Sequence, residues 1–126
     1  MSISPVQLFE VNGNSTPMKT LGGSVAVGTG LLIPAVAGKK IRVHGYEAQT
    51  EAGSGTPGSF ILTNGSGGSA LSRLVYPPLS TVSPCYQKPV IDSGYFETST
   101  GVGLGITVAT ANIKIEVHYT EYTPPL

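Results

Sequence analysis

Glycine and proline interrupt most of the chain, and the longest stretch that lacks both runs over residues 106–123. Apolar and polar residues alternate along it, with the period of two expected of a strand with one buried face. An amphipathic helix would need apolar residues three and four positions apart, and the stretch does not supply them consistently. The alternating apolar residues are Leu104, Ile106 and Val108, then, in the opposite parity, Ile113, Ile115, Val117 and Tyr119. The change of parity predicts a C-terminal β-hairpin that reverses at residues 109–112, with these residues lining the core.

The composition of the chain favours short strands over helices. Seventeen of the 126 residues are glycine, ten are proline and only 11% are charged, and both glycine and proline destabilise helix interiors. Clusters of turn-forming residues recur at intervals of about ten residues, a spacing typical of two-sheet proteins. The sequence therefore predicts an all-β fold, an antiparallel, jelly-roll-like β-sandwich of seven or eight short strands without helices.

Several further strands are predicted between the turns. They cover residues 31–33, which end at Pro34, then 40–51, 59–63, 70–76 and 90–98, with an irregular segment at 79–89. Strict alternation along 40–51 puts Ile41, Val43 and Gly45 on one face and Arg42, His44 and Tyr46 on the other.

The chain is long enough to bury a single core without disulfides or metals, and we expect one sandwich domain over residues 28–126. Residues 1–27 are the least regular part, with a short predicted strand at 6–11 followed by a turn. Two interpretations of this segment stay open: an arm that binds a partner, or an extra edge strand of the sandwich.

The charge pattern bears on the class of partner. The formal net charge is zero, with seven basic and seven acidic residues scattered singly, so the chain lacks the basic patch of a nucleic-acid-binding protein. It begins with neither a basic region nor a long apolar run, and we expect no signal peptide and no membrane partner. The single Cys85 excludes an intrachain disulfide and a cysteine-based zinc cluster, and it agrees with synthesis in a reducing cytoplasm.

Few side chains are of the kinds that carry catalysis. The chain has one aspartate, Asp92, and two histidines, His44 and His118, both at polar strand positions that would face solvent or an interface. A nucleophile needs an adjacent base and an orienting group, and no activating neighbour of Cys85 can be identified. Because histidine pairs, acidic clusters and a phosphate-binding loop are also missing from the sequence, we expect no enzyme, no catalytic residue, no metal site and no cofactor.

Two other groups of polar residues have a structural and a functional interpretation. The six tyrosines outnumber the three phenylalanines, and there is no tryptophan. Tyrosine suits protein interfaces and sugar stacking, but packing on a sheet face explains any single one at least as well. Lys39, Lys40 and Arg42 form a small basic group at a strand start, which is either solvated or set against an acidic partner surface.

Two motifs resemble those of small all-β virion proteins of tailed bacteriophages. Residues 37–46 (AGKKIRVHGY) are similar to a pattern AGK-x-IRV-x-x-Y on one strand of these proteins. Residues 94–98 (GYFET), a glycine turn at Gly101 and two alternating strands follow in the same order, so the resemblance covers about two thirds of the chain. The chain departs from the pattern at Tyr95, where the family usually has tryptophan, and after the glycine turn, where Val102 and Gly103 replace an acidic residue.

The resemblance implies a capsid decoration, or cement, protein. Such a protein binds the outer capsid surface as a homo-oligomer, a trimer or a dimer, and stabilises contacts between major capsid protein subunits. This task needs binding rather than chemistry, and symmetry repeats a modest contact. We therefore expect the chain on the outer surface of the virion capsid after synthesis in the host cytoplasm. The partner-contact candidates lie in the N-terminal arm and the 79–89 segment: Val6, Leu8, Phe9, Val11, Leu79, Val82 and Tyr86.

A second function class also fits part of the sequence. Tyrosines and glycine-rich loops suit a host-glycan-binding module of a tail fibre or tail spike. Such a module would bring polar and aromatic residues together in a groove and often follows a trimeric stalk. No stalk or coiled-coil pattern occurs in these 126 residues, so we rank this alternative second.

Overall fold

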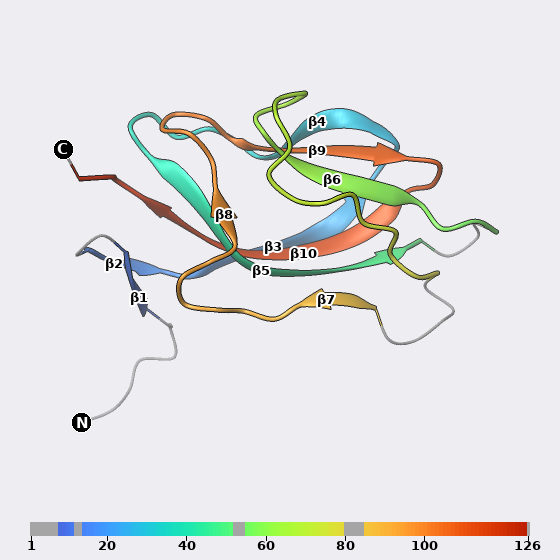
Figure 1. Cartoon of the computed structure of the whole chain (residues 1–126), viewed down its shortest axis with the longest axis horizontal. Coiled ribbons are helices and arrows are strands. Elements are labelled where there is room, and N and C mark those ends of the chain that lie inside the picture. Colours follow the sequence, from blue (N-terminus) through green and yellow to red (C-terminus); the bar gives the residue numbers. More distant parts are fainter. Residues whose placement is uncertain (1–7, 12–13, 52–54, 80–84, 126) are drawn as a thin grey trace.

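The structure is a computed structural model that describes residues 8–11, 14–51, 55–79 and 85–125, and this part of the chain is all-β, with 54% strands and no helix. No helix that could span a membrane occurs among these residues. The ten strands (Figure 1) are β1 (Leu8–Val11), β2 (Asn14–Pro17), β3 (Lys19–Val25), β4 (Gly28–Ile33), β5 (Lys40–Thr50), β6 (Ser59–Asn64), β7 (Tyr86–Lys88), β8 (Phe96–Glu97), β9 (Leu104–Ala109) and β10 (Ile113–Tyr122).

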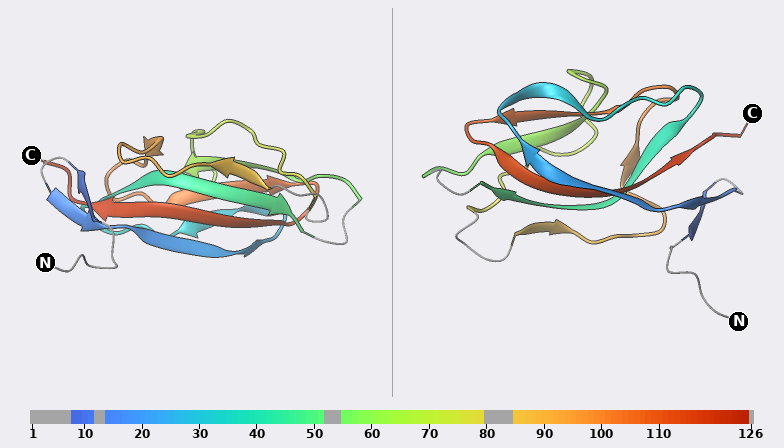
Figure 2. Two further views of the ribbon diagram at one scale, coloured as in Figure 1. Left: turned by 90° about the horizontal axis from the view of Figure 1, so that it is seen from below. Right: turned by 180° about the vertical axis from the view of Figure 1, so that it is seen from behind.

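Two antiparallel sheets face each other, and Figures 1 and 2 show them as two layers. The larger sheet has the order β3-β10-β5-β7, with β8 also paired to β5, and the smaller has the order β4-β9-β6. Strands β1 and β2 form a separate antiparallel pair. The predicted all-β, sandwich-like fold with two antiparallel sheets is confirmed. The number of strands among the described residues is higher than the seven or eight predicted. β2 and β7 lie in segments expected to be irregular, and β3 is an extra edge strand, one of the two interpretations left open for residues 1–27.

The core lies between the two sheets. All seven alternating apolar residues of the C-terminal region are buried, from Leu104, Ile113 and Val117 at 0% exposure to Tyr119 at 9%. They pack with residues of β4, β5 and β6, chiefly Ile33, Ile41, Val43, Tyr46, Ala48, Phe60 and Leu62. At about 1.5–3 kcal/mol for each fully buried large apolar side chain, this layer is the main stabilising element of the fold.

The predicted C-terminal hairpin is wrong. Strand β10 pairs with β3 and β5 in the larger sheet, whereas β9 pairs with β4 and β6 in the smaller one. The connection therefore crosses from one sheet to the other through Thr110, whose φ of 74° lies in the left-handed region. The change of parity in the sequence is real. Its cause is that both strands turn their apolar sides to the space between the sheets.

Strict alternation along β5 is also wrong, because a bulge interrupts it. His118 pairs with Gly45 and Tyr119 pairs with Val43, so that His44 is the additional residue on β5. Beyond the bulge the parity changes, and Tyr46 is buried on the core side with Ile41 and Val43. His44, predicted to face solvent or an interface, is 0% exposed.

Three segments between the long strands differ from prediction. Residues 70–76 form no continuous strand and make only isolated bridges, Thr63 to Ala70 and Phe60 to Val75. The expected strand at 90–98 is reduced to the two residues of β8, and the segment 79–89, expected to be irregular, contains β7. Proline and glycine at the ends of these short segments limit how far a ladder can extend.

Part of the segment 1–27 belongs to the larger sheet. Strand β3 pairs with β10 over seven residues, from Lys19 opposite Tyr119 to Val25 opposite Ile113. Its place at the end of the strand order makes it an edge strand, and Figure 2 (left) shows it outermost beside β10. The short β1–β2 pair precedes it in the chain.

Candidate functional site: a polar groove on the larger sheet

The outer face of the larger sheet carries a groove of about 460 Å³. Residues from β3, β5 and β10 line it because alternate residues of each strand point away from the core. The lining is mixed. Glu47, Gln49, Lys114, Glu116 and Ser24 contribute polar groups, and the other described residues that line it are Gly22, Gly23, Ala48, Cys85 and Ile115. The glycines of β3 leave one side of the groove without side-chain bulk.

Two carboxylates stand directly opposite each other in this groove. Glu116 on β10 pairs with Glu47 on β5, and like charges at directly opposite positions repel each other. Each carboxylate has a separate neighbour: the amide of Gln87 donates to Glu47 Oε2 over 3.4 Å, and Nε2 of His118 lies 3.2 Å from Glu116 Oε1. Each carboxylate thus has a polar neighbour of its own.

His118 links β10 to the edge strand. Its Nδ1 lies 3.1 Å from the hydroxyl of Thr20 on β3, while Nε2 faces the Glu116 carboxylate. A neutral ring satisfies both contacts when Nε2–H donates to Glu116 and Nδ1 accepts from Thr20. The side chain is 26% exposed, so this histidine is partly open to solvent on the outer face of the larger sheet, as its polar strand position predicted.

A smaller hollow of about 210 Å³ lies on the β7 side of the same sheet. Glu47 lines both hollows, so the two share one wall. The other lining residues are Tyr46, Gln87, Lys88, Pro89, Val90 and His118. Together the two hollows present carboxylate, amide, ammonium and imidazole groups, which can hydrogen-bond to a polar ligand or partner surface.

The cysteine, histidine and aspartate of the sequence are not brought together in the described part of the chain. Cys85 Sγ lies 3.6 Å from Glu47 Oε2, so the thiol does have a carboxylate neighbour that the sequence did not reveal. His44 is engaged elsewhere: its Nδ1 donates to the Ile91 carbonyl and its Nε2 accepts from the Thr120 hydroxyl, each over 2.9 Å. Asp92 is exposed. Among the described residues, no three His, Cys, Asp or Glu are placed to hold a metal ion.

The basic residues at the start of β5 are paired rather than open. Arg42 Nη2 lies 3.2 Å from Glu97 Oε2 on β8, and Lys40 Nζ lies 3.8 Å from Glu97 Oε1. The Tyr122 hydroxyl donates to the same carboxylate, and the Arg42 guanidinium lies 5.0 Å from the centre of the Tyr122 ring. These contacts join β5, β8 and the end of β10.

The two motif segments meet at this place. Val43 pairs with Phe96 and Arg42 with Glu97, and Tyr46 contacts the rings of both Tyr95 and Phe96 at centroid distances of 6.5 and 6.2 Å. Burial, followed by the neighbouring Tyr86, raises the pKa of the Tyr46 hydroxyl. Most of the motif residues of 37–46 and 94–98 thus serve packing and ion pairing within the fold.

The predicted partner-contact residues fall in different places. Val6 and Val82 lie outside the described residues, and Leu8, Phe9 and Val11 belong to β1, of which only the backbone is described. Leu79 is half-buried and its backbone bridges to Thr50. Tyr86 is half-buried too, with its ring 6.2 Å from that of Tyr46 and packed against the core. For Tyr86, packing on the sheet is the role that its contacts show.

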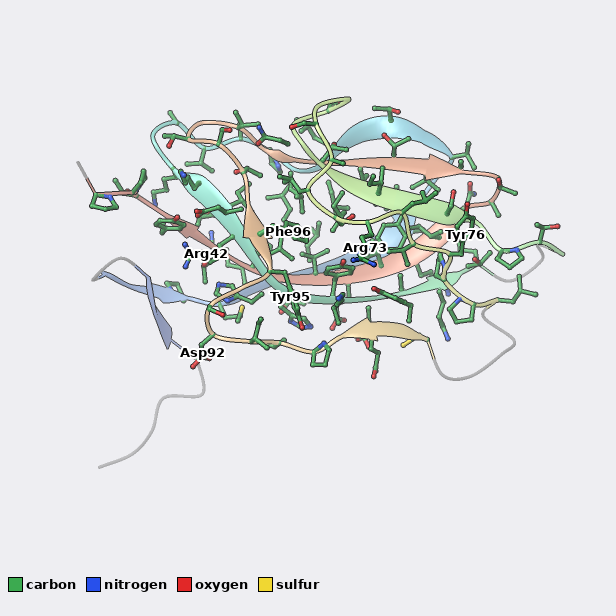
Figure 3. All side chains as sticks on the ribbon, viewed as in Figure 1. Arg42, Arg73, Tyr76, Asp92, Tyr95 and Phe96 are labelled. Atoms are coloured by element: carbon green, nitrogen blue, oxygen red, sulfur yellow. The ribbon has the colours of Figure 1, made fainter. Side chains whose placement is uncertain are left out.

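Among the described residues, exposed apolar side chains occur at three places, one of which borders the smaller hollow through Val90. They are Val27 and Leu31 around the β3–β4 connection, Leu74 and Tyr76 in the segment after β6, and Val90 and Ile91 after β7. Tyr76 is the most exposed, at 67%, and Figure 3 places it toward the opposite end of the long axis from Arg42. None of these six was a predicted contact residue, since isolated apolar residues in turn-rich segments carry no distinctive pattern.

Comparison of the chain with known protein families, characterised proteins and solved structures finds no match.

Proposed function

We propose that the chain is a structural virion protein of the capsid decoration, or cement, type, which binds the outer capsid surface and stabilises contacts between major capsid protein subunits. The observation that carries the proposal is the meeting of the two motif segments. Residues 37–46 and 94–98, through which the sequence resembles small phage virion proteins, pair through Arg42 with Glu97 and Val43 with Phe96. A shared motif that builds one packed junction supports descent of the fold and its use, rather than chance similarity of two separate runs.

The surface of the molecule agrees with a role in binding. Two hollows lie on the outer face of the larger sheet, and apolar residues of the described part of the chain are exposed at three places, one of which borders the smaller hollow. A cement protein acts by burying such surface where capsid subunits meet, which adds to their mutual binding free energy.

We include the jelly-roll-like form of the sandwich in the proposal. Both the β3–β4 and the β9–β10 connections pass from one sheet to the other, and such crossings are typical of double-sheet Greek-key folds. Location on the virion, synthesis in the host cytoplasm and an oligomeric state of two or three follow from the same proposal.

A host-glycan-binding module of a tail fibre or spike is the second candidate, and the groove is the observation that favours it. Glu47, Gln49, Lys114 and Glu116 converge there, and such groups hydrogen-bond to sugar hydroxyls. No aromatic ring from the described part of the chain lines this groove, however. A sugar-stacking platform of the kind expected for this class is therefore not part of it.

Co-sedimentation with purified capsids tests the first proposal. The full chain is mixed with mature capsids stripped of accessory proteins, and the bound fraction is measured against capsid concentration. Saturable binding that also raises the temperature of capsid disruption is expected. Absence of binding, together with a glycan-array signal that Glu47→Gln and Glu116→Gln abolish, would replace the first proposal by the second.

A truncation separates the arm from the sheet. Removing residues 1–17 leaves β3 in place, whereas removing 1–27 also deletes the strand that pairs with β10. If the residues before β3 contact the capsid, the shorter truncation weakens capsid binding while thermal unfolding stays close to that of the full chain. Unchanged capsid binding would exclude the arm as a contact.

A further inference from the structure

Strand β3 is a long edge strand with one side open. Among the described residues its ladder partner is β10, which it meets over seven residues, and Thr20, Gly22, Gly23 and Ser24 are all exposed. In an antiparallel ladder only every second residue turns its N–H and C=O toward a given neighbour. The residues between them point their backbone groups away from β10, as a row that another strand can pair with.

The strand also lacks the usual features that prevent edge-to-edge pairing. Charged side chains, proline and bulges serve this purpose in many proteins. No charged residue occurs from Thr20 to Gly38 and no proline from Lys19 to Ile33. The ladder with β10 is regular along the whole of β3. Its single charge, Lys19, is at the end of the strand and is paired with Glu121 over 2.7 Å.

From this edge we infer that β3 is a self-association site, at which β3 of one copy pairs antiparallel with β3 of a second copy across a two-fold axis through Gly22. Such a contact uses the same surface on both copies, as a closed two-fold dimer requires. The four-strand paths β3-β10-β5-β7 of the two copies then form one continuous sheet. The observations for this contact come from the edge strand alone. The contact specifies the dimer of the two oligomeric states that the proposed function includes, but a dimer without capsid binding would contradict the proposed function and leave this inference standing.

The register follows from the length of the strand. Residues that stand opposite each other in an antiparallel pair point to the same face of the sheet. In a symmetric pair this condition is met only if the two-fold axis passes through a residue position rather than between two positions. Gly22 is the middle of Lys19–Val25, so an axis there pairs the full length of the strand. If the axis moves by one residue, the last two residues at one end of each β3 have no partner in the other copy.

Side chains fit each other in this register. Leu21 of one copy stands opposite Gly23 of the other, where a Cβ atom would meet nothing within 4 Å. Leu21 is half-buried against the core of its own copy, so each leucine would extend the apolar layer across the junction. On the outer side Thr20 stands opposite Ser24, a pair that favours hydrogen bonding across strands.

The absence of charge allows a second copy as the occupant, and the matching pairs in this register favour it. Directly opposite like charges destabilise a strand pair, and a symmetric contact duplicates any charge that it contains. In this register Lys19 stands opposite the apolar Val25, and every other pair is uncharged. The strand is therefore free of the repulsion that prevents most charged edges from pairing with themselves.

Charge substitutions on the outer side test the contact. Thr20→Lys with Ser24→Lys places lysine opposite lysine twice, and Thr20→Glu with Ser24→Glu places glutamate opposite glutamate. The dimer dissociation constant, measured by sedimentation equilibrium, should rise roughly 10- to 100-fold in each variant alone. Mixing the two variants should restore dimers that contain one copy of each, because every pair is then of opposite charge. Both variants lose the Thr20–His118 contact, so the mixture controls for that loss.

Cross-linking tests the register. In a Cys85→Ser background, Gly22→Cys puts two thiols opposite each other at the axis, where Cβ atoms of paired residues lie close enough for a disulfide. Mild oxidation of Gly22→Cys should give a covalent dimer, while Ser24→Cys, which faces Thr20, should give much less. Circular dichroism melts establish that each variant is folded.

Three results would overturn the inference. The first is a wild-type chain that stays monomeric at about 100 μM, a concentration sufficient for a weak specific dimer. This result would leave the edge to a strand from a different protein. The second is an oligomer whose dissociation constant does not rise in the lysine and glutamate variants. The third is a disulfide that forms as readily in Ser24→Cys as in Gly22→Cys.

Discussion

The hydroxyl of Tyr122 donates a hydrogen bond to the carboxylate of Glu97, although the two residues lie on β10 and β8. The same carboxylate oxygen accepts from Arg42 on β5, which stands between them. Glu97 is thus a shared acceptor that joins three strands at this end of the larger sheet. Its side chain is only 31% exposed, so these contacts are partly shielded from water.

Replacing Glu97 by glutamine should destabilise the fold by about 1–2 kcal/mol, as expected for loss of charge-assisted hydrogen bonds. Arg42 and Lys40 would keep their charges without an opposing carboxylate. Tyr122→Phe is the matched control, since it removes one donor and keeps the ion pairs, and it should cost less. Urea unfolding followed by circular dichroism measures both, and equal effects would show that the ion pairs contribute nothing.

The same carboxylate predicts a dependence of stability on pH. Burial alone would raise the pKa of Glu97, but the hydrogen bond from Tyr122 and the charges of Arg42 and Lys40 outweigh it and hold the pKa below its usual value of 4.5. The unfolded chain therefore takes up the proton first as the pH falls, and the stabilisation is present above pH 4.5 and lost below it. The unfolding free energy of Glu97→Gln should show a smaller decrease across this range. Parallel curves for both proteins would contradict the assignment.

The sequence predicted best what depends on local pattern. Alternation identified the core-facing residues of β9 and β10, such as Ile106 and Ile115, because burial of one strand face is recorded at every second residue. It did not identify the partner strands. The alternation of apolar residues changes parity between β9 and β10. This change looks the same in the sequence whether the chain folds back as a hairpin or crosses to the facing sheet, as it does at Thr110.

The candidate groove could not be predicted, for the same reason. Glu116 occupies a polar position in an alternating run, but strict alternation along residues 40–51 would place Glu47 on the same face as Ile41 and Val43. That they stand opposite each other depends on the β5–β10 register and on the bulge at His44. Pairing register is set by contacts between distant segments, and a single sequence holds no direct record of them.

His44 should make the protein less stable in weakly acidic solution. Burial lowers the pKa of its imidazole below 6.5, and Arg42 acts in the same direction, while the Ile91 carbonyl and Asp92 oppose the shift. The unfolded chain binds the proton more readily, so the unfolding free energy should fall as the pH drops below about 6.5. A His44→Gln variant should lose this slope between pH 7 and 5.5, whatever its absolute stability. A slope unchanged by the substitution would assign it to another group.

Two glycines on neighbouring strands of the smaller sheet should differ in how much their substitution by alanine changes the stability of the fold. At Gly105 on β9 an added Cβ would overlap the carbonyl oxygen of Gly65, whereas at Gly30 on β4 it would meet nothing within 4 Å. Gly105→Ala should therefore cost about 1–3 kcal/mol through overpacking, while Gly30→Ala should leave the melting temperature nearly unchanged or raise it slightly. Differential scanning calorimetry compares the two. Equal melting temperatures would mean that the Gly65 turn moves freely, and that it does not support β9.

In the middle of β10, the same substitution should have opposite outcomes for folding on the core-facing and the outer side of the larger sheet. Ile115 is 4% exposed and stands between Ala48 and Gly23, whereas its neighbour Lys114 is exposed on the outer face. A carboxylate at Ile115 would be buried without an opposite charge, which costs several kcal/mol and exceeds what a domain of this size can lose. Ile115→Asp should therefore give an unfolded chain by circular dichroism, and Lys114→Asp, the same substitution one residue away, should fold. A folded Ile115→Asp protein would show that the space between the sheets admits water at this position.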